Sequence, residues 1–444
     1  MRYDELSTPA YIVQEGALKK NLEILKDVED STGCRILLAE KAFSMFKVYP
    51  LIAEYLAGTT ASGLYEAKLS YEEFCRKADD AGMAGSAADS STTGVCAEAE
   101  AAEGDADSST AGVCAENHVF EPAYKISEMK ELCEICDHIY YNSLSQLELH
   151  RSIWEPYQKA GKLKVALRIN PEHSTQEGHE IYDPCAVGSR LGIRRALLPE
   201  KLPDGVSGLH FHTLCEQGVE PLIETFRSVE EKFSSQLHQI SWINMGGGHH
   251  ITKADYDVQK LKDFLNEVKA KYDIDIYLEP GEAIALNAGT LITKVLDIVE
   301  TEDMPTFIMD ASAACHMPDV LEMPYTPPLF GALKSGMEEY LEEKNWGSAD
   351  GRSEGKTESE GVWVRLASRT CLAGDVIGIY KLPFLPKVGD ILTFGDMAIY
   401  SMVKNNTFNG MSLPDIVLEH DTADDDRYEL VKSFGYKDFK ERLS

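Results

Sequence analysis

The feature that most constrains the fold of this chain is an alternation of short apolar runs with helical stretches over roughly its first 290 residues. A short apolar run at 9–13 precedes the helical pattern of Leu18, Leu22 and Leu25. Runs rich in β-forming residues follow at 36–39, 164–169, 208–212, 240–245 and 274–278. Strands that alternate with helices predict a parallel sheet with crossover helices, and this many units favour a closed barrel over an open sheet.

The pattern changes after about residue 290, where strands follow one another without regular helices. The expected strands lie at 291–299, 306–309, 362–366, 376–380 and 391–394. We therefore predict an α/β fold: a (β/α)8 TIM-like barrel with a C-terminal β-rich domain that also takes the N-terminal strand near Tyr11. The expected domains are residues 1–30, a strand and helix that join the β domain, residues 31–290, the barrel, and residues 291–444, the β domain.

Two polar segments belong to neither pattern. Residues 76–118 are rich in Ala, Ser, Gly, Asp and Glu, and the string DSSTTGVCAE from Asp89 returns as DSSTAGVCAE from Asp107. Residues 334–361 are similarly polar, although a short helix fits 337–344. Such compositions bury too little apolar surface to offset the entropy of ordering, so we predict an insertion in each domain.

Composition excludes several classes of function. A formal net charge of -31 argues against binding to nucleic acid or to an anionic membrane, because both need clustered Lys and Arg. No apolar run is long enough to cross a bilayer and the first residues do not resemble a secretion signal, so we expect a cytoplasmic protein. Cys133 and Cys136 form one CxxC with His138 close behind, but no second pair follows, and we predict no metal.

Several polar residues follow the predicted barrel strands, at the end of the barrel where barrel enzymes do chemistry. Lys41 follows the run 36–39, and Glu279 follows the run 274–278. Gly246, Gly247 and Gly248 follow the run 240–245 and leave backbone N–H groups open to an anion. His210 and His212 share one face of their strand. Each feature is common and weak by itself.

The β domain contributes a second set of candidates. The string RTCLAGD contains Cys371 and Asp375, and Tyr400 precedes the string SMVKNNTFNG. A thiol beside an acidic turn carries little information until it is combined with the residues of the barrel.

The order of these features resembles the fold-type III decarboxylases that use pyridoxal 5'-phosphate (PLP), a family that includes ornithine and diaminopimelate decarboxylases. Within it the chain is most similar to the carboxynorspermidine (carboxyspermidine) decarboxylases. The resemblance runs from about residue 8 to the C terminus, outside the two polar segments. The strings that have close counterparts are TPAYIV, KAFSMF, GTTAS, YNSLSQLE, LRINPE, YDPCAVGSRLG, GLHFHTLCEQ, GGGHHIT, LEPGEA, CHMPDVLEMPY, TCLAGD and TFNG.

The resemblance implies a role for each barrel residue. Lys41 corresponds to the lysine that holds PLP covalently. Glu279 corresponds to the acid that keeps the pyridine nitrogen protonated, and His212 to the histidine that stacks on the ring. The three glycines, Gly246 to Gly248, bind the phosphate through their backbone, with a hydrogen bond from Tyr400.

The resemblance also implies a homodimer with shared active sites. Cys371 would protonate the carbon that has lost carbon dioxide and would reach the cofactor of the opposite subunit. The implied substrate is a carboxylated polyamine, whose distant amines require carboxylates. Asp319 and Glu322 are the candidates in the string CHMPDVLEMPY, and Asp375 is assigned with them to substrate binding.

The chain departs from the family pattern in three places. Ala367, Ser368 and Arg369 replace a glycine-proline type of entry to the TCLAGD turn. Glu40 stands before Lys41 where the family usually has an apolar residue, and could alter the basicity of the lysine. Glu282 replaces the arginine of an EPGR string, as in the carboxynorspermidine branch, which leaves the charge partner of the phosphate unassigned. Two alternatives stay open: a decarboxylase of diaminopimelate or another diamino acid, and a non-catalytic PLP-binding or regulatory relative.

Overall fold

The protein divides into two compact units, which the computed structural model describes over residues 1–75, 115–176, 180–349, 361–424 and 427–444. One unit contains Asn21–Ile284, and the other contains Met1–Lys20 with Ala285–Ser444. The boundaries therefore fall at Lys20 and Ala285, where the sequence analysis expects 30 and 290. We call the first the barrel unit and the second the sheet unit.

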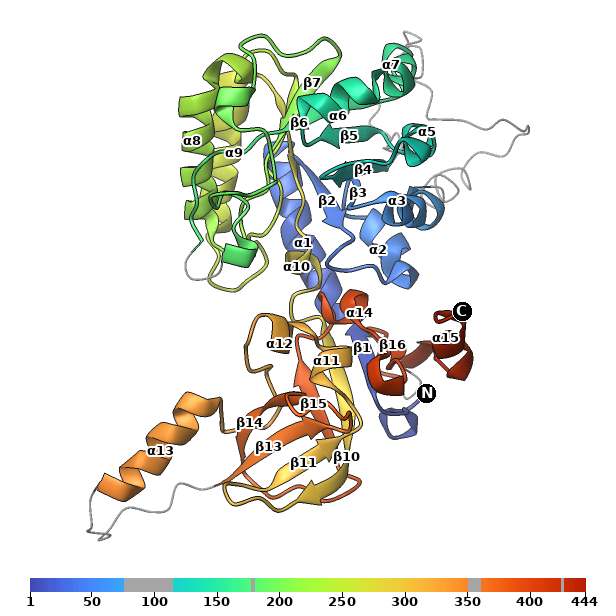
Figure 1. Cartoon of the computed structure of the whole chain (residues 1–444), viewed down its shortest axis with the longest axis vertical. Coiled ribbons are helices and arrows are strands. Elements are labelled where there is room, and N and C mark those ends of the chain that lie inside the picture. The colour runs from blue at the N-terminus through green and yellow to red at the C-terminus, as the bar shows by residue number, and fades with distance from the viewer. Residues whose placement is uncertain (76–114, 177–179, 350–360, 425–426) are drawn as a thin grey trace. The chain divides into compact units, whose positions relative to one another are not determined.

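The barrel unit is a closed ring of eight parallel strands, which confirms the predicted (β/α)8 fold. Figure 1 shows strands of this unit with helices outside them. The strands pair in sequence order, and the last pairs with the first. They are β2 (Arg35–Ala39), β3 (Gly58–Ala61), β4 (Glu116–Glu121), β5 (His138–Tyr141), β6 (Lys164–Arg168), β7 (Val206–His210), β8 (Trp242–Asn244) and β9 (Asp275–Leu278).

Helices alternate with the barrel strands along the chain, and the longest of them, α8 (Val219–Leu237), buries one apolar face. In α8 the buried residues Leu222, Phe226, Val229 and Phe233 recur at helical spacing, so one stripe of the helix meets the barrel. The helices in chain order are α1 (Glu15–Thr32), α2 (Tyr49–Ala53), α3 (Leu64–Ser70), α5 (Ile126–Ile135), α6 (Leu144–Leu149), α7 (Arg151–Lys159), α8 (Val219–Leu237), α9 (Val258–Tyr272) and α10 (Glu282–Ala285).

The barrel interior is filled partly by aromatic and polar side chains. Tyr140, Trp242 and Tyr277 pack there with Leu37 and Ala166. Because successive side chains of a strand point to opposite faces, residues two positions away from these also face the interior. This alternation places Asn244 and Glu279 toward the end of the barrel where β8 and β9 finish.

The sheet unit is built on one nine-stranded sheet. Its path runs β12-β14-β13-β11-β10-β1-β16-β17, with β15 paired to β10. β1 (Ala10–Gln14) lies between β10 and β16, antiparallel to the former and parallel to the latter, which confirms that the β-rich domain takes the N-terminal strand. The other strands are β10 (Gly289–Val299), β11 (Thr306–Met309), β12 (Lys334–Ser335), β13 (Val362–Ser368), β14 (Val376–Leu382), β15 (Ile391–Gly395), β16 (Asp415–Glu419) and β17 (Tyr428–Lys432).

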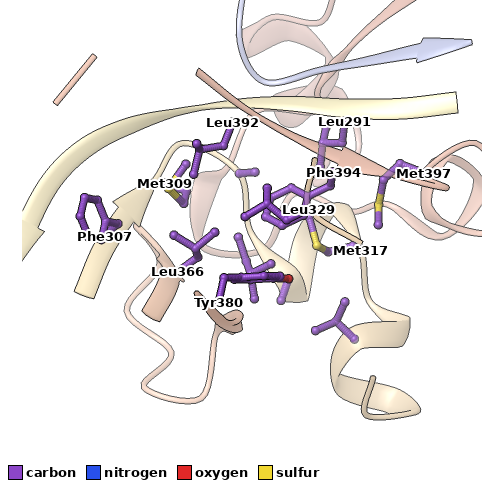
Figure 2. Close-up of a cluster of buried hydrophobic side chains, with 14 of the residues drawn as sticks. Leu291, Phe307, Met309, Met317, Leu329, Leu366, Tyr380, Leu392, Phe394 and Met397 are labelled. Atoms are coloured by element: carbon purple, nitrogen blue, oxygen red, sulfur yellow. The ribbon is translucent and has the colours of Figure 1, made fainter. Parts of the chain in front are cut away.

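A compact apolar cluster holds the sheet unit together. Figure 2 shows Leu291, Phe307, Met309, Leu366 and Phe394 within it, contributed by four different strands. In β13 buried residues alternate with more accessible ones, as expected of a sheet that covers a core with one face. Short helices complete the unit: α11 (Ala313–His316), α12 (Asp319–Glu322), α13 (Met337–Ala349), α14 (Ser401–Lys404) and α15 (Tyr436–Glu441).

The structure changes the expected limits of both polar segments. β4 begins at Glu116, inside the range assigned to the first insertion, and the rest of that insertion up to 114 lies outside the described residues. In the second segment β12 pairs with β14, and α13 follows it. A two-residue strand has no sequence pattern of its own, because only its backbone pairing defines it. Among the described residues no helix is long and apolar enough to span a membrane.

Candidate active site

Lys41 lies just beyond the end of β2, beside the histidine that follows β7. Its Nζ is 3.3 Å from Nε2 of His212. Although the Lys41 side chain is exposed, the surrounding protein desolvates the amine, and this lowers the pKa of Lys41 against the opposing pull of Glu279. A lysine with a lowered pKa provides more of the neutral amine, which is the nucleophilic form.

The orientation of the His212 ring is determined by the glycine loop. The N–H of Gly247 donates to Nδ1 of His212 over 3.0 Å, so Nδ1 is an acceptor and the proton of the neutral ring sits on Nε2. Burial, reinforced by the charge of Lys41, holds the pKa of His212 well below its usual value. His212 is therefore a neutral ring whose Nε2–H faces the Lys41 amine.

Glu279 follows β9 as a buried carboxylate. Its Oε1 accepts hydrogen bonds from Thr60 over 3.0 Å and from Asn244 over 2.7 Å. Burial by itself would raise the pKa of Glu279, but His210, whose Nε2 lies 3.3 Å from Oε2, together with other donors lowers the pKa to about 2. The group is thus a permanent anion, and Oε2 carries fewer hydrogen bonds than Oε1.

The glycine triplet is required by the close approach of its neighbours. Gly246 and Gly248 have φ of 72° and 84°, in the region that favours glycine. A Cβ at Gly247 would lie 1.9 Å from the carbonyl oxygen of Glu279, and one at Gly248 would lie 1.9 Å from that of Leu214. Any residue with a side chain would push apart the loops after β7, β8 and β9.

The prediction that the triplet leaves its N–H groups free is wrong for two of the three glycines. Gly246 donates to Oδ1 of Asn244 over 2.8 Å, and Gly247 donates to His212. Only the N–H of Gly248 has no acceptor among the residues that the structure describes. The sequence could not reveal this, because the two acceptors are side chains whose positions depend on the fold.

Five of the predicted site residues belong to the sheet unit, and Cys371, Tyr400 and Asp375 are three of them. Cys371 is exposed in the turn after β13, and its N–H donates to Oδ1 of Asn409 over 2.8 Å. Tyr400 precedes α14 with φ of 52°, an uncommon conformation for a residue with a side chain. Asp375 is buried and accepts from Ser312 and Thr370, over 2.6 Å and 2.5 Å, which gives it a structural role in addition to the predicted substrate contact.

The two acidic candidates in the sheet unit are not separate groups. Asp319 and Glu322 lie at the two ends of α12, and both carboxylates bind Nζ of Lys404. An ammonium group therefore already occupies the position between them. Their predicted contact with the substrate stays a prediction.

Two of the departures from the family pattern, Glu282 and Glu40, have partners in the structure. Oε2 of Glu282 lies 2.7 Å from Nε2 of His250, so the acid of EPGE pairs with the second histidine of GGGHH. The side chain of Glu40 is fully buried and accepts a hydrogen bond from Tyr49 over 2.8 Å. Glu40 thus contributes to the packing behind the lysine and does not face its amine.

Three further residues shape the site, although no motif in the sequence assigns them a role: Thr60, Arg168 and Asn244. Arg168 is buried, and its Nη2 donates to the backbone oxygen of His212 over 2.9 Å. Asn244 touches Glu279 and the glycine loop together. Each is a polar residue at or near the end of a barrel strand, which is a signal that a search of the strand ends would have found.

Several known proteins that resemble this chain are decarboxylases. Residues 11–398 match the family described as pyridoxal-dependent decarboxylase, C-terminal sheet domain. The chain is 35% identical, over all of both sequences, to carboxynorspermidine/carboxyspermidine decarboxylase of Campylobacter jejuni. It is 33% identical to carboxyaminopropylagmatine decarboxylase of Synechocystis, over all of this chain and 97% of that protein.

A solved structure supports the same relationship. The structure of carboxynorspermidine decarboxylase from Campylobacter jejuni, complexed with norspermidine, matches with a TM-score of 0.79 and 33% identity, covering 98% of this chain and all of that one. The diaminopimelate decarboxylase of Helicobacter pylori, at 15% identity and a TM-score of 0.71, shares the fold. The chain belongs to the pyridoxal-dependent decarboxylases, the family of carboxy-lyases that its sequence predicts.

Proposed function

We propose that the protein uses PLP to remove carbon dioxide from carboxynorspermidine or carboxyspermidine, a step that yields norspermidine or spermidine in polyamine biosynthesis. The observation that carries the proposal is the grouping of Lys41, His212 and Glu279 at one end of the barrel. An amine with a lowered pKa, a neutral ring and a buried carboxylate suit a protein that binds PLP, because the amine can bond to the cofactor and the acid can pair with its ring nitrogen.

The residues present fit the cofactor. Lys41 would hold it covalently through Nζ, and Oε2 of Glu279, which has spare acceptor capacity, would bind the protonated ring nitrogen. His212 would pack against the ring, and the N–H of Gly248 would bind the phosphate. Bound PLP supplies an electron-withdrawing ring that accepts the electron pair left behind when carbon dioxide departs.

We further propose that the active form is a homodimer. Cys371 would deliver the proton to the carbon that has lost carbon dioxide, and Tyr400 would donate a hydrogen bond to the phosphate. The exposure of Cys371 in a single chain supports this role, because a proton donor that serves a partner subunit must be accessible before assembly. The cytoplasmic location stays a prediction.

The acidic residues of α12 support a polyamine as the substrate class. Two carboxylates that already hold the Lys404 ammonium are suited to bind an ammonium of a polyamine in its place. The Synechocystis relative supports a second candidate, carboxyaminopropylagmatine.

The proposal is tested with the purified protein by its absorbance and by carbon dioxide release. Addition of PLP should produce the long-wavelength band of a protein-bound cofactor. Release from carboxynorspermidine or carboxyspermidine should exceed release from carboxyaminopropylagmatine and from diaminopimelate. A faster reaction with diaminopimelate would overturn the substrate assignment, and a protein that never acquires the band would overturn the whole proposal.

Two variants separate the proposed roles. Lys41→Ala should abolish the band, whereas Cys371→Ala should keep the band and lose turnover. If the sites are shared between subunits, an equal mixture of the two variants, unfolded and refolded together, should recover about a quarter of the normal activity, because half of the dimers then contain one complete site of two. No recovery would contradict the shared site.

A further inference from the structure

A row of hydrogen-bonded side chains extends through the barrel interior below Glu279. We call it the interior chain, and it consists of Asn244, Tyr140, His118 and Glu116, from β8, β5 and β4. Tyr140 and His118 are fully buried, and Asn244 is likewise excluded from solvent. Glu116 is the first residue of β4, at the end of the barrel opposite Glu279, and it pairs there with Arg35 of β2.

Each link in the interior chain is short. Nδ2 of Asn244 donates to Oε1 of Glu279 and to the hydroxyl of Tyr140, both over 2.7 Å. The Tyr140 hydroxyl is 2.5 Å from Nδ1 of His118. Nε2 of His118 lies 3.1 Å from Oε2 of Glu116, and Nη1 of Arg35 lies 2.5 Å from Oε1 of the same acid.

The direction of these hydrogen bonds follows from the donors available. Oδ1 of Asn244 accepts the N–H of Gly246, so both hydrogens of its amide are available for Glu279 and Tyr140. The Tyr140 hydroxyl accepts one of these hydrogens and must donate its own to Nδ1 of His118. With Nδ1 of His118 as the acceptor, its Nε2 carries a proton that points at Glu116. Burial raises the pKa of Tyr140 far above its usual value, so the hydroxyl keeps its proton.

The lower end of the chain also has the composition of a cation site, since Glu116, His118 and His138 gather there. Their geometry argues against that reading. The rings of His118 and His138 are stacked, with centroids 3.9 Å apart and planes at 23°. Nitrogen lone pairs lie in the ring plane, so two stacked rings direct theirs along nearly parallel lines and do not converge on one ion.

We propose that the interior chain is a positioning device: it holds the carboxylate of Glu279 in one orientation, and thereby keeps the ring nitrogen of the cofactor protonated. The inference rests on the proposed function and extends it to residues that never touch the cofactor. Asn244 is the central link, because its one amide contacts Glu279, the interior chain and the glycine loop.

Other charged groups also act on Glu279. His210 from β7 lies against Oε2, and Arg168 from β6 and Lys41 after β2 are near enough to interact electrostatically. These three groups act on the charge of Glu279 by direct electrostatic interaction. The interior chain differs because it binds Oε1, so it controls the direction of the carboxylate as well as its charge.

A matched pair of variants on β5 tests the proposal. Tyr140→Phe removes a hydroxyl that links Asn244 to His118, whereas Tyr141→Phe removes the hydroxyl of the next residue, which is equally buried and has no hydrogen-bond partner among the described residues. Both proteins are loaded with PLP that carries an isotope label on its ring nitrogen. The NMR chemical shift of that nitrogen reports its protonation.

For Tyr140→Phe we expect the ring-nitrogen signal to move toward the unprotonated position and kcat to fall about five- to tenfold, the effect of one buried hydrogen bond. Tyr141→Phe should leave both unchanged. An equal signal in Tyr140→Phe, Tyr141→Phe and the unchanged protein would overturn the inference while leaving the proposed function intact. Absence of a PLP band in the unchanged protein would instead reject the proposed function.

A second variant, Glu116→Gln, tests the same proposal if Tyr140→Phe does not fold. Glu116→Gln keeps the shape of the far end of the chain and removes its charge, at a partly accessible position. Because Glu116 lies at the opposite end of the barrel, we expect the ring-nitrogen signal to move in the same direction by a smaller amount. An unchanged signal in Glu116→Gln, together with an unchanged or unobtainable Tyr140→Phe, would reject the interior chain as a positioning device.

Discussion

Glu40 and Lys41 are adjacent in the chain but lie in different surroundings. Lys41 reaches the end of the barrel, while Glu40 is enclosed beside Tyr49, and its Oε2 has no hydrogen-bond partner among the described residues. Burial raises the pKa of Glu40 well above its usual value, so the side chain is held as a neutral acid. Glu279 is the main carboxylate that acts on the Lys41 amine, which corrects the expectation that Glu40 alters its basicity.

The buried acid predicts a dependence of stability on pH. A carboxyl with a raised pKa holds its proton more tightly in the folded state, so its contribution to stability is full below the unfolded pKa, 4.5, and is lost as pH rises toward the folded value. Glu40→Gln should therefore raise the free energy of unfolding by roughly 1–3 kcal/mol near neutral pH, and much less at about pH 4.5.

Urea denaturation at the two pH values measures this difference. The control is Glu54→Gln, a change at an exposed glutamate farther along the chain. It should have little effect on the free energy of unfolding at either pH. Equal effects of Glu40→Gln at both pH values would show that the side chain is ionised in the folded protein.

At the scale of an element, the glycine loop holds three strand ends at once. Gly246 accepts the N–H of Glu279 over 2.8 Å through its carbonyl oxygen, while the triplet donates to Asn244 and His212. The loop therefore couples the position of the carboxylate to that of the neutral histidine. A change in its backbone should disturb both groups.

Gly247→Ala tests this coupling. The added Cβ meets the backbone of Glu279, which cannot move as a flexible side chain would, so we expect a loss of about 2–3 kcal/mol of stability and weaker retention of PLP after gel filtration. Gly435→Ala is the control, because no heavy atom lies within 4 Å of the corresponding Cβ. Normal PLP retention by Gly247→Ala would contradict the role of the loop.

At the scale of the whole molecule, the chain carries a formal net charge of -31. Repulsion among like charges opposes the compact state, and salt screens it over a Debye length of about 8 Å at physiological ionic strength. We expect the midpoint of thermal unfolding to rise when NaCl is increased from about 0.01 M to about 0.15 M. KCl at equal ionic strength should act alike. A falling midpoint would show that screened ion pairs outweigh the repulsion.

The strands that the sequence predicts best are those with uninterrupted apolar runs. β11 and β9 lie where their runs predict them, while the run 208–212 is displaced, because β7 covers Val206–His210. The sequence did not predict β4 and β5. His118, His138 and other polar residues interrupt the apolar pattern by which a buried strand is recognised. His118 is also part of the lower end of the interior chain, where it is hydrogen-bonded to Glu116.

The sequence by itself determined the barrel, the β-rich second unit and the family, because periodic burial and short motifs are properties of neighbouring residues. It also placed Lys41, His212 and Glu279 at strand ends. Only the tertiary structure decided which polar atoms meet: Oε1 of Glu279 with Asn244, the glycine loop with His212, and Lys404 with the acids of α12. Such contacts join residues far apart in the chain, and their formation depends on strand register and side-chain rotamers, which no local pattern encodes.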